Sequence, residues 1–190
     1  MLVLVASDVH SDVGAARLLV RSAELHNADL LIVTGDACSP IVIKEIASYR
    51  TLYVSGNMDD SSVIKEAERQ GILLDGKVIQ VKGFTFAGMS LSEEVPKVGV
   101  GDRWVLLTHY PPKDSEADLA YSGRHVGSYV VRRVIEDMRP LACFCGHIHE
   151  SPTISKLGET LIVNPGPAYR RRAVLVDLEE VKAKPIRLVE

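Results

Sequence analysis

The sequence has little cysteine, no long apolar run and no excess of basic residues. Its three cysteines are odd in number, which argues against a disulfide framework and favours a reducing, cytoplasmic location. No apolar stretch approaches the roughly 18 residues that a membrane helix needs, and the apolar start lacks the features of a signal peptide. The net charge of −3 gives no general attraction to nucleic acid or anionic membranes. An extended nucleic-acid-binding surface is therefore not favoured, although a small active site could accept a nucleotide.

What is present is the composition of an ordinary globular protein. Of the 190 residues, 46% are apolar and 25% are charged. A chain of this length buries about 70% of the surface that it exposes when unfolded, so it needs no disulfide or metal to fold. The sequence predicts a single domain over residues 1–190 and leaves a homo-oligomer open.

Short apolar runs alternate with helical patterns along the first half of the chain. Met1 to Ala6 read as a buried strand, and residues 13–27 carry apolar residues at helical spacing after Asp12, a plausible N-cap. The other predicted helices span 41–48, 61–70 and 128–138. The other predicted strands span 30–33, 52–54, 77–81, 84–88, 104–107, 141–145 and an antiparallel set over 153–156, 160–163, 173–178 and 184–189. The alternation predicts an α/β fold with parallel pairing.

Five of the predicted strands end in a short loop that contains Asp, Asn or His. These residues are Asp8 and His10, Asp36, Asn57, His109, and His147 and His149. Any one of them has a simpler explanation, since Asp caps helices and Asn is common in turns. In open α/β sheets, however, sites collect just past the carboxyl ends of the strands. The repeated ending therefore predicts a metal site.

In order, these blocks read Asp-x-His, Gly-Asp, Gly-Asn-x-Asp, Thr-His and Gly-His-x-His. The series resembles the calcineurin-like metallophosphoesterase superfamily, and the resemblance covers the whole chain. The small size, the Gly56–Asp59 stretch and the Asn164–Gly166 stretch are most similar to its small phosphodiesterase branch. The resemblance implies a four-layer α/β/β/α sandwich of two mixed sheets flanked by helices. It also implies a metal-dependent phosphoesterase acting on a small phosphate ester, with a phosphodiester favoured over a monoester.

The resemblance further implies a dinuclear centre bridged by Asp36, in which hydroxide between the ions attacks phosphorus. One metal would be held by Asp8, His10, Asp36 and His149. The other would be held by Asp36, Asn57, His109 and His147. Imidazole and oxygen ligands suit Mn²⁺, with Fe, Zn²⁺, Ni²⁺ or Co²⁺ as alternatives. The residues expected to be catalytic are Asp36, Asn57, His109 and His125.

The proton donor is the unassigned part of this mechanism. Relatives commonly place a histidine and then an acidic residue after the asparagine, but here the first of these positions is Met58. Asp59 is expected either to orient a metal-binding histidine or to cap the next helix. His125, in a polar loop before a helix, is predicted to contact substrate phosphate or to protonate the leaving oxygen. Its alternative is a solvated loop histidine.

Substrate contacts are expected from Asn57, His125 and Arg170. Arg170, Arg171 and Arg172 are predicted to alternate on a strand, which would turn one or two of them toward a phosphate. Charge runs are usually solvated, so a purely exposed role is the alternative.

Two other functions belong to proteins of the same fold class. A metal-binding scaffold for protein partners would be expected to lose ligands, whereas every ligand position is filled in this chain. A DNA nuclease finds no support in the net charge of −3. Cys143 and Cys145 are predicted to be small core residues, and Cys38 to lie near the site.

Overall fold

The computed structural model describes residues 1–94, 97–99 and 103–189. The strands are β1 (Leu2–Ala6), β2 (Leu30–Thr34), β3 (Thr51–Val54), β4 (Val78–Val81), β5 (Phe84–Met89), β6 (Trp104–Thr108), β7 (Ala142–Phe144), β8 (Thr153–Leu157), β9 (Thr160–Asn164), β10 (Arg172–Asp177) and β11 (Lys182–Arg187). The helices are α1 (Val13–Leu25), α2 (Pro40–Ile46), α3 (Ser61–Arg69), α4 (Tyr129–Met138) and the short 3-10 helix η1 (Ala168–Arg170). Apart from η1, each of these elements was predicted. The predicted loop over residues 91–101 lies partly outside the described residues.

The strands form two mixed sheets. In the described part of the chain the first sheet has the order β11-β10-β1-β2-β3, and the second has the order β4-β5-β6-β7-β9-β8. The strands β1, β2 and β3 are parallel, as are β5, β6, β7 and β9, while the outer pairings are antiparallel. The carboxyl ends of the parallel strands in each sheet therefore share one edge, where the predicted ligands follow.

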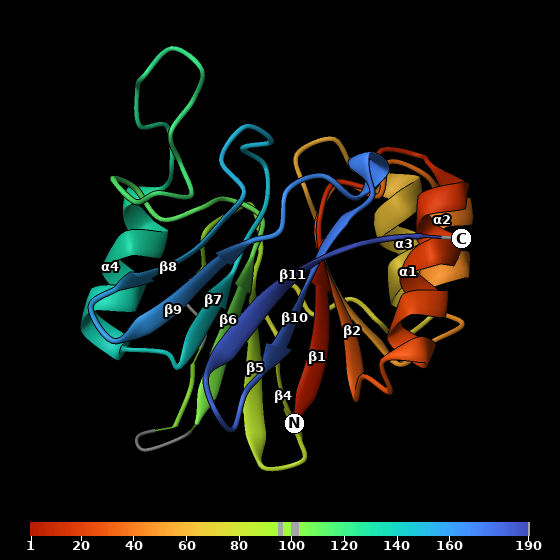
Figure 1. Cartoon of the computed structure of the whole chain (residues 1–190), viewed down its shortest axis with the longest axis horizontal. Helices are drawn as coiled ribbons and strands as arrows, with labels where there is room; N and C mark the ends of the chain where they lie inside the picture. The colour runs from red at the N-terminus through yellow and green to blue at the C-terminus, as the bar shows by residue number, and fades with distance from the viewer. Residues whose placement is uncertain (95–96, 100–102, 190) are drawn as a thin grey trace.

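Three apolar clusters separate four layers. In β1, Val3 and Val5 face the second sheet, whereas Leu4 and Ala6 pack under the helices, because successive strand residues point to opposite faces. The helices α1, α2 and α3 cover the first sheet, and α4 covers the second (Figure 1). Each fully buried Leu or Val stabilises this arrangement by roughly 1.5–3 kcal/mol. The predicted four-layer α/β/β/α sandwich is confirmed.

The helix starts follow from local capping. Asp12 caps α1 as predicted, with its side chain accepting the N–H of Ala15 at 2.9 Å. For α3 the cap is Asp60, whose carboxylate accepts the N–H groups of the first turn. The cap role considered for Asp59 is therefore wrong. No helix in the described ranges is long and apolar enough to cross a membrane.

The carboxyl-terminal part differs from the prediction in two respects. The predicted antiparallel set is two hairpins, β8–β9 in the second sheet and β10–β11 in the first. The expected strand over three arginines is also wrong. Arg170 ends η1, Arg171 adopts a left-handed φ of +64°, and only Arg172 enters β10. The turn at Arg171 closes a hydrogen bond from its N–H to the carbonyl of Ala168, which a strand could not make.

Candidate metal centre

The predicted ligands follow the carboxyl ends of five strands, and several adopt unusual backbone geometry. Asp8 follows β1 with φ +55°, His10 has φ +47°, Asp36 follows β2 with φ +52°, and His147 follows β7 with φ +68°. Residues other than glycine rarely occupy this left-handed region, and such strain is concentrated at functional sites. The loops therefore present these side chains at some conformational cost.

Two glycines allow the loops to approach closely. A Cβ atom at Gly56 would overlap the carboxylate and backbone nitrogen of Asp36. Gly35 has φ +99°, and a Cβ atom there would overlap the ring of His109. The glycines of the Gly-Asp and Gly-Asn blocks are thus needed for space as well as for turning.

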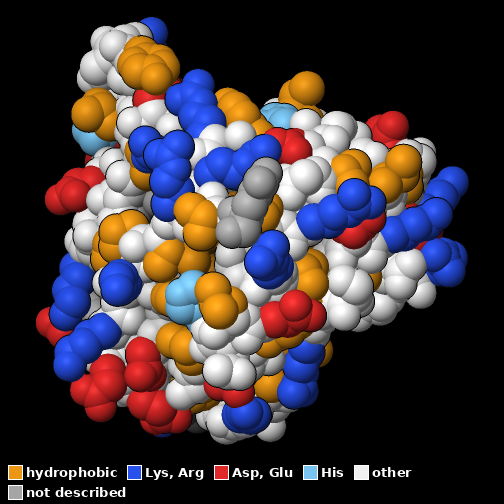
Figure 2. Space-filling model, turned by 45° about the vertical axis from the view of Figure 1, so that its right-hand side comes forward, with side chains coloured by type: hydrophobic (Ala, Val, Ile, Leu, Met, Phe, Trp, Pro, Cys, Tyr) orange, Lys and Arg blue, Asp and Glu red, His pale blue; other side chains and the backbone are white. Residues whose placement is uncertain are grey.

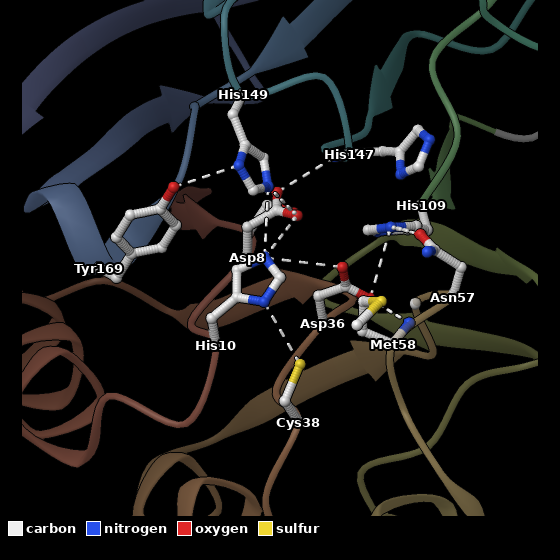
Figure 3. Close-up of polar contacts among 12 residues, drawn as sticks. Asp8, His10, Asp36, Cys38, Asn57, Met58, His109, His147, His149 and Tyr169 are labelled. Carbon is white, nitrogen blue, oxygen red and sulfur yellow. Dashed lines mark hydrogen bonds and ion pairs between the residues drawn. The ribbon is translucent and has the colours of Figure 1, made fainter.

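The first group of side chains lies around Asp8. Its Oδ1 is 3.1 Å from Nε2 of His149 and 3.8 Å from Nε2 of His10. The two Nε2 atoms lie 3.3 Å from one another. Three side chains from the loops after β1 and β7 thus direct ligand atoms at one point, with those atoms within 4.8 Å of each other (Figure 3).

Asp36 connects this group to a second one. Its Oδ2 lies 3.7 Å from Nε2 of His10, and its Oδ1 lies 3.6 Å from Nε2 of His109. The same Nε2 of His109 is 2.9 Å from Oδ1 of Asn57. The two carboxylate oxygens thus face two separate histidine groups, which is the arrangement that a bridging ligand requires (Figure 3).

His147 lies at the edge of the second group. Its ring centroid is 5.0 Å from that of His109 and 4.9 Å from that of Tyr110. Burial and the neighbouring His109 lower the pKa of His147 to about 4, so its ring is neutral at neutral pH. A neutral imidazole is the form that binds a metal ion. The backbone N–H of His147 also donates to Oδ2 of Asp8 at 3.1 Å, which ties the β7 loop to β1.

Opposing electrostatic effects act on the pKa values of the two buried carboxylates, Asp8 and Asp36. Burial raises the pKa of Asp36, and the charges of Asp8 and Asp59 add to this increase, although His109 opposes it. Burial also acts to raise the pKa of Asp8, but the hydrogen bond from His149 and the charge of His109 outweigh it. The pKa of Asp8 therefore lies below its ordinary value of 3.8. Close carboxylates of this kind are stabilised by nearby positive charge.

Comparison with known proteins identifies the family. Residues 1–179 match the calcineurin-like phosphoesterase superfamily domain. The chain belongs to the calcineurin-like phosphoesterase superfamily. The uncharacterized protein MJ1162 of Methanocaldococcus jannaschii is 32% identical over 170 residues, covering 74% of this chain and 78% of that protein.

Solved structures of other proteins share the fold. The crystal structure of TT1561 of Thermus thermophilus matches with a TM-score of 0.79 and 16% identity, covering 99% of both chains. The structure of an archaeal phosphodiesterase matches with a TM-score of 0.70 and 18% identity, covering 99% of this chain and 100% of that one. At these identities the likeness concerns the fold, and it agrees with the two mixed sheets of this phosphoesterase.

The side chains of this phosphoesterase fit metal ions, on which its superfamily depends. Nδ1 of His109 is 2.8 Å from the carbonyl oxygen of Thr34, which only accepts, so a neutral His109 carries its proton on Nδ1 and a lone pair on Nε2. That lone pair then faces Oδ1 of Asn57 with no proton between them. A cation between the two atoms removes this repulsion, because both become its ligands.

Asp59 has a role other than the two that were expected. The carboxylate of Asp59 accepts the backbone N–H groups of Asp36, Cys38 and Gly56, at 3.1, 2.8 and 2.7 Å. It therefore orients two ligand-bearing loops, and the idea that it orients a histidine is wrong. The side chain of Met58 is exposed, while its N–H donates to Oδ1 of Asp36 at 2.9 Å.

His125 belongs to a different group of side chains. Its Nδ1 donates to Oδ1 of the buried Asp118 at 2.6 Å. That carboxylate also accepts the N–H groups of Asp114, Ser115 and Gly127, so it holds the loop before α4 together. Among the described residues, no hydrogen bond or ion pair joins His125 to the metal cluster. Its part in phosphate binding or proton transfer stays a prediction.

The three arginines separate in the structure. Nη1 of Arg171 lies 2.6 Å from Oδ2 of Asp12, so this guanidinium is engaged in an ion pair with Asp12. The guanidinium of Arg170 lies 5.5 Å from the ring centroid of Tyr169, whose hydroxyl contacts His149. Arg170 is therefore next to the first group. The hydrogen bond to Asp8 raises the pKa of His149, and the charge of Arg170 opposes this increase.

The sequence did not point to Tyr169 or Thr34. Tyr169 follows the Asn164–Pro167 turn, and its place beside His149 depends on how η1 packs against the β7 loop. Thr34 contributes a backbone carbonyl, for which residue identity gives no signal. Cys38 was expected near the site, and its sulfur lies 3.4 Å from Nδ1 of His10.

Proposed function

We propose that this phosphoesterase hydrolyses a phosphodiester using two divalent metal ions, with Mn²⁺ as the first choice. The first ion would be held by Asp8, His10, Asp36 and His149. The second would be held by Asp36, Asn57, His109 and His147. The observation that carries the proposal is that Oδ2 and Oδ1 of Asp36 face His10 and His109 at 3.7 and 3.6 Å. When bound, a pair of cations acts as a Lewis acid toward phosphate and lowers the pKa of water.

The chain's own contribution is to fix these ligands before the substrate arrives. The carbonyl of Thr34 sets the tautomer of His109, and the N–H of Met58 orients Oδ1 of Asp36. The sulfur of Cys38 lies against Nδ1 of His10 and leaves Nε2 turned toward Asp36. Ligands held in this way bind and react without further reorganisation, which is a main source of catalysis at such sites.

The substrate's phosphate is proposed to contact Arg170. This side chain is exposed and lies beside Tyr169 at the rim of the first group. Lys and Arg side chains also gather over the upper part of one face, at the end of the molecule where β1 terminates (Figure 2). Positive charge near the centre attracts phosphate esters despite the overall charge of −3. The archaeal phosphodiesterase of the same fold supports a diester as the substrate class.

A direct assay tests this proposal. Hydrolysis of bis(p-nitrophenyl) phosphate and of p-nitrophenyl phosphate is measured across Mn²⁺, Zn²⁺, Ni²⁺, Co²⁺ and Fe²⁺. The diester is expected to be the better substrate, and Asp36→Asn to lose about 10³-fold in rate, because metal charge stabilisation is worth several kcal/mol. Asp137→Asn is the matched control, since Asp137 is exposed on α4 and pairs with Arg133, at 3.7 Å.

Each outcome of the assay has a meaning. Preference for the monoester would identify a phosphomonoesterase. No hydrolysis with any metal would reject the enzymatic proposal and favour a protein-binding scaffold. The proton donor has its own test. Unchanged turnover of His125→Ala on diesters with poor leaving groups would remove His125 from the mechanism.

A further inference from the structure

The hydroxyl group of Tyr169 contacts His149 on the side that faces away from the first metal group. Its oxygen lies 3.2 Å from Nδ1 of His149. The ring of Tyr169 also meets two imidazoles edge-on, with centroid distances of 5.7 Å to His149 and 5.5 Å to His10. Figure 3 shows the phenol beside both histidines, across from Asp36. Tyr169 thus supports both imidazoles of the first group.

The two ring nitrogens of His149 have chemically different neighbours. Nε2 lies 3.1 Å from Oδ1 of Asp8, a carboxylate oxygen that only accepts. Nδ1 faces the hydroxyl of Tyr169, which can donate or accept. When the ring is neutral and no cation is bound, Nε2–H donates to Asp8, and Nδ1 accepts the hydroxyl proton of Tyr169.

A cation bound at Nε2 would require the other tautomer of the neutral ring. The ring would carry its proton on Nδ1 in place of Nε2, so its total number of protons would be unchanged. The hydroxyl of Tyr169 could then rotate and accept this Nδ1–H. The contact between the hydroxyl and Nδ1 is therefore kept in both states, and only its direction reverses.

His109 provides the contrast. Its Nδ1 lies 2.8 Å from the carbonyl of Thr34, which cannot donate, so its tautomer is fixed with or without a metal ion. His109 thus has an outer partner that can only accept a hydrogen bond, whereas His149 has one that can either donate or accept.

We infer that Tyr169 is a positioning residue that keeps His149 hydrogen-bonded in both tautomers and directs its Nε2 toward the first metal ion. The inference rests on the proposed function in one respect, namely that His149 is a metal ligand. Partners that orient a metal-binding histidine typically change metal affinity by about 10–100-fold. Tyr169 is expected to act in this range, on one of the two ions.

The first test measures metal binding without any substrate. Tyr169→Phe removes the hydroxyl and keeps the ring, so the packing against His10 is retained. Zn²⁺ affinity is measured by competition with a chromophoric chelator. One of the two binding steps is expected to weaken about 10–100-fold, while the other is unchanged. Tyr129→Phe is the matched control, since Tyr129 is 72% exposed, and it should bind like the wild type.

The second test reads the tautomers directly, a readout that loss of general stability would not move. Imidazole ¹⁵N shifts are recorded in mildly alkaline buffer, without metal and with Zn²⁺. His149 is expected to change from Nε2–H to Nδ1–H on loading, whereas His109 stays Nδ1–H in both states. Equal affinity in Tyr169→Phe and wild type, or an Nδ1–H proton on His149 in both states, would overturn the inference.

The two proposals fail in different ways. A wild type that binds two ions but hydrolyses no ester would overturn the proposed function and leave the role of Tyr169 standing. Normal hydrolysis combined with unchanged metal binding in Tyr169→Phe would overturn the role of Tyr169 alone.

Discussion

Asp59 offers the sharpest test of how the centre is built, because it holds two ligand-bearing loops without being proposed as a ligand. It lies after β3, and its carboxylate reaches across to the loop after β2. We predict that Asp59→Asn destabilises the metal-free protein and weakens metal binding. The substitution keeps the size of the side chain and removes only its charge and one acceptor oxygen.

The magnitude follows from the hydrogen bonds that the carboxylate accepts. Oδ2 accepts the N–H groups of Asp36 and Gly56 at 3.1 and 2.7 Å, and also the hydroxyl of Tyr53. Oδ1 accepts the N–H of Cys38 at 2.8 Å. In either orientation of Asn, an NH₂ group would face at least one of these donors. Losing one charge-assisted bond and leaving its donor unpaired costs about 3–5 kcal/mol in the free energy of unfolding.

The neighbouring residue supplies the control. Asp60 caps α3 by accepting the N–H groups of Ser62 and Val63 at 2.8 and 3.2 Å. Asn and Asp are nearly equal N-caps, so Asp60→Asn should change the free energy of unfolding by only a few tenths of a kcal/mol. Urea unfolding of both variants without metal, followed by Mn²⁺ titration, makes the comparison. If Asp59→Asn matched Asp60→Asn in stability and in affinity, the role given to Asp59 would be refuted.

Three further predictions concern other parts of the molecule. Burial acts to raise the pKa of Asp118, but the hydrogen bonds from His125 and from backbone N–H groups outweigh it and keep this pKa below 3.8. The ionised carboxylate of Asp118 therefore stabilises the fold fully above pH 3.8, and this contribution is lost as the pH falls through the lower pKa of the folded state. Protection factors for amide exchange, which compare each amide with its unfolded rate at the same pH, should fall over this pH range in the loop before α4 of the wild type and be low at every pH in Asp118→Ala; unchanged protection in Asp118→Ala would contradict this. Arg170→Ala should raise KM for the diester about 10–100-fold, because a charge-assisted phosphate contact is worth roughly 1.5–3 kcal/mol; an unchanged KM would contradict the contact. Thiol titration at neutral pH should find Cys38 slow, since burial and nearby carboxylates raise its pKa to about 12, and the buried Cys143 and Cys145 unreactive; rapid labelling of the native protein would contradict this.

The fold was predictable because its apolar pattern is strong and local. In β1, alternate residues pack into two different clusters, and Asp12 caps α1 with the geometry that its sequence position indicates. The carboxyl-terminal strands were harder, because periodicity identifies strands but does not say which sheet each one joins. The η1 turn was missed for a related reason, since a run of arginines suits a strand as well as a turn.

The positions of the metal-cluster residues were predictable because five strand ends share a chemical type. Their outer partners were not. Asp59 sits close to Asn57 in sequence, yet three of its four partners are backbone N–H groups, which carry no side-chain signal. Tyr169 reaches His149 only because η1 packs beside the β7 loop. Contacts of this kind depend on tertiary packing and require the structure.

The central claim is that Asp36 joins two metal sites, and counting metal ions tests it most directly. After equilibrium dialysis against Mn²⁺, the wild type is expected to retain about two ions per chain. Asp36→Asn should retain at most one, because the shared carboxylate is lost, and Asp137→Asn should match the wild type. Retention of two tightly bound ions by Asp36→Asn would contradict the claim.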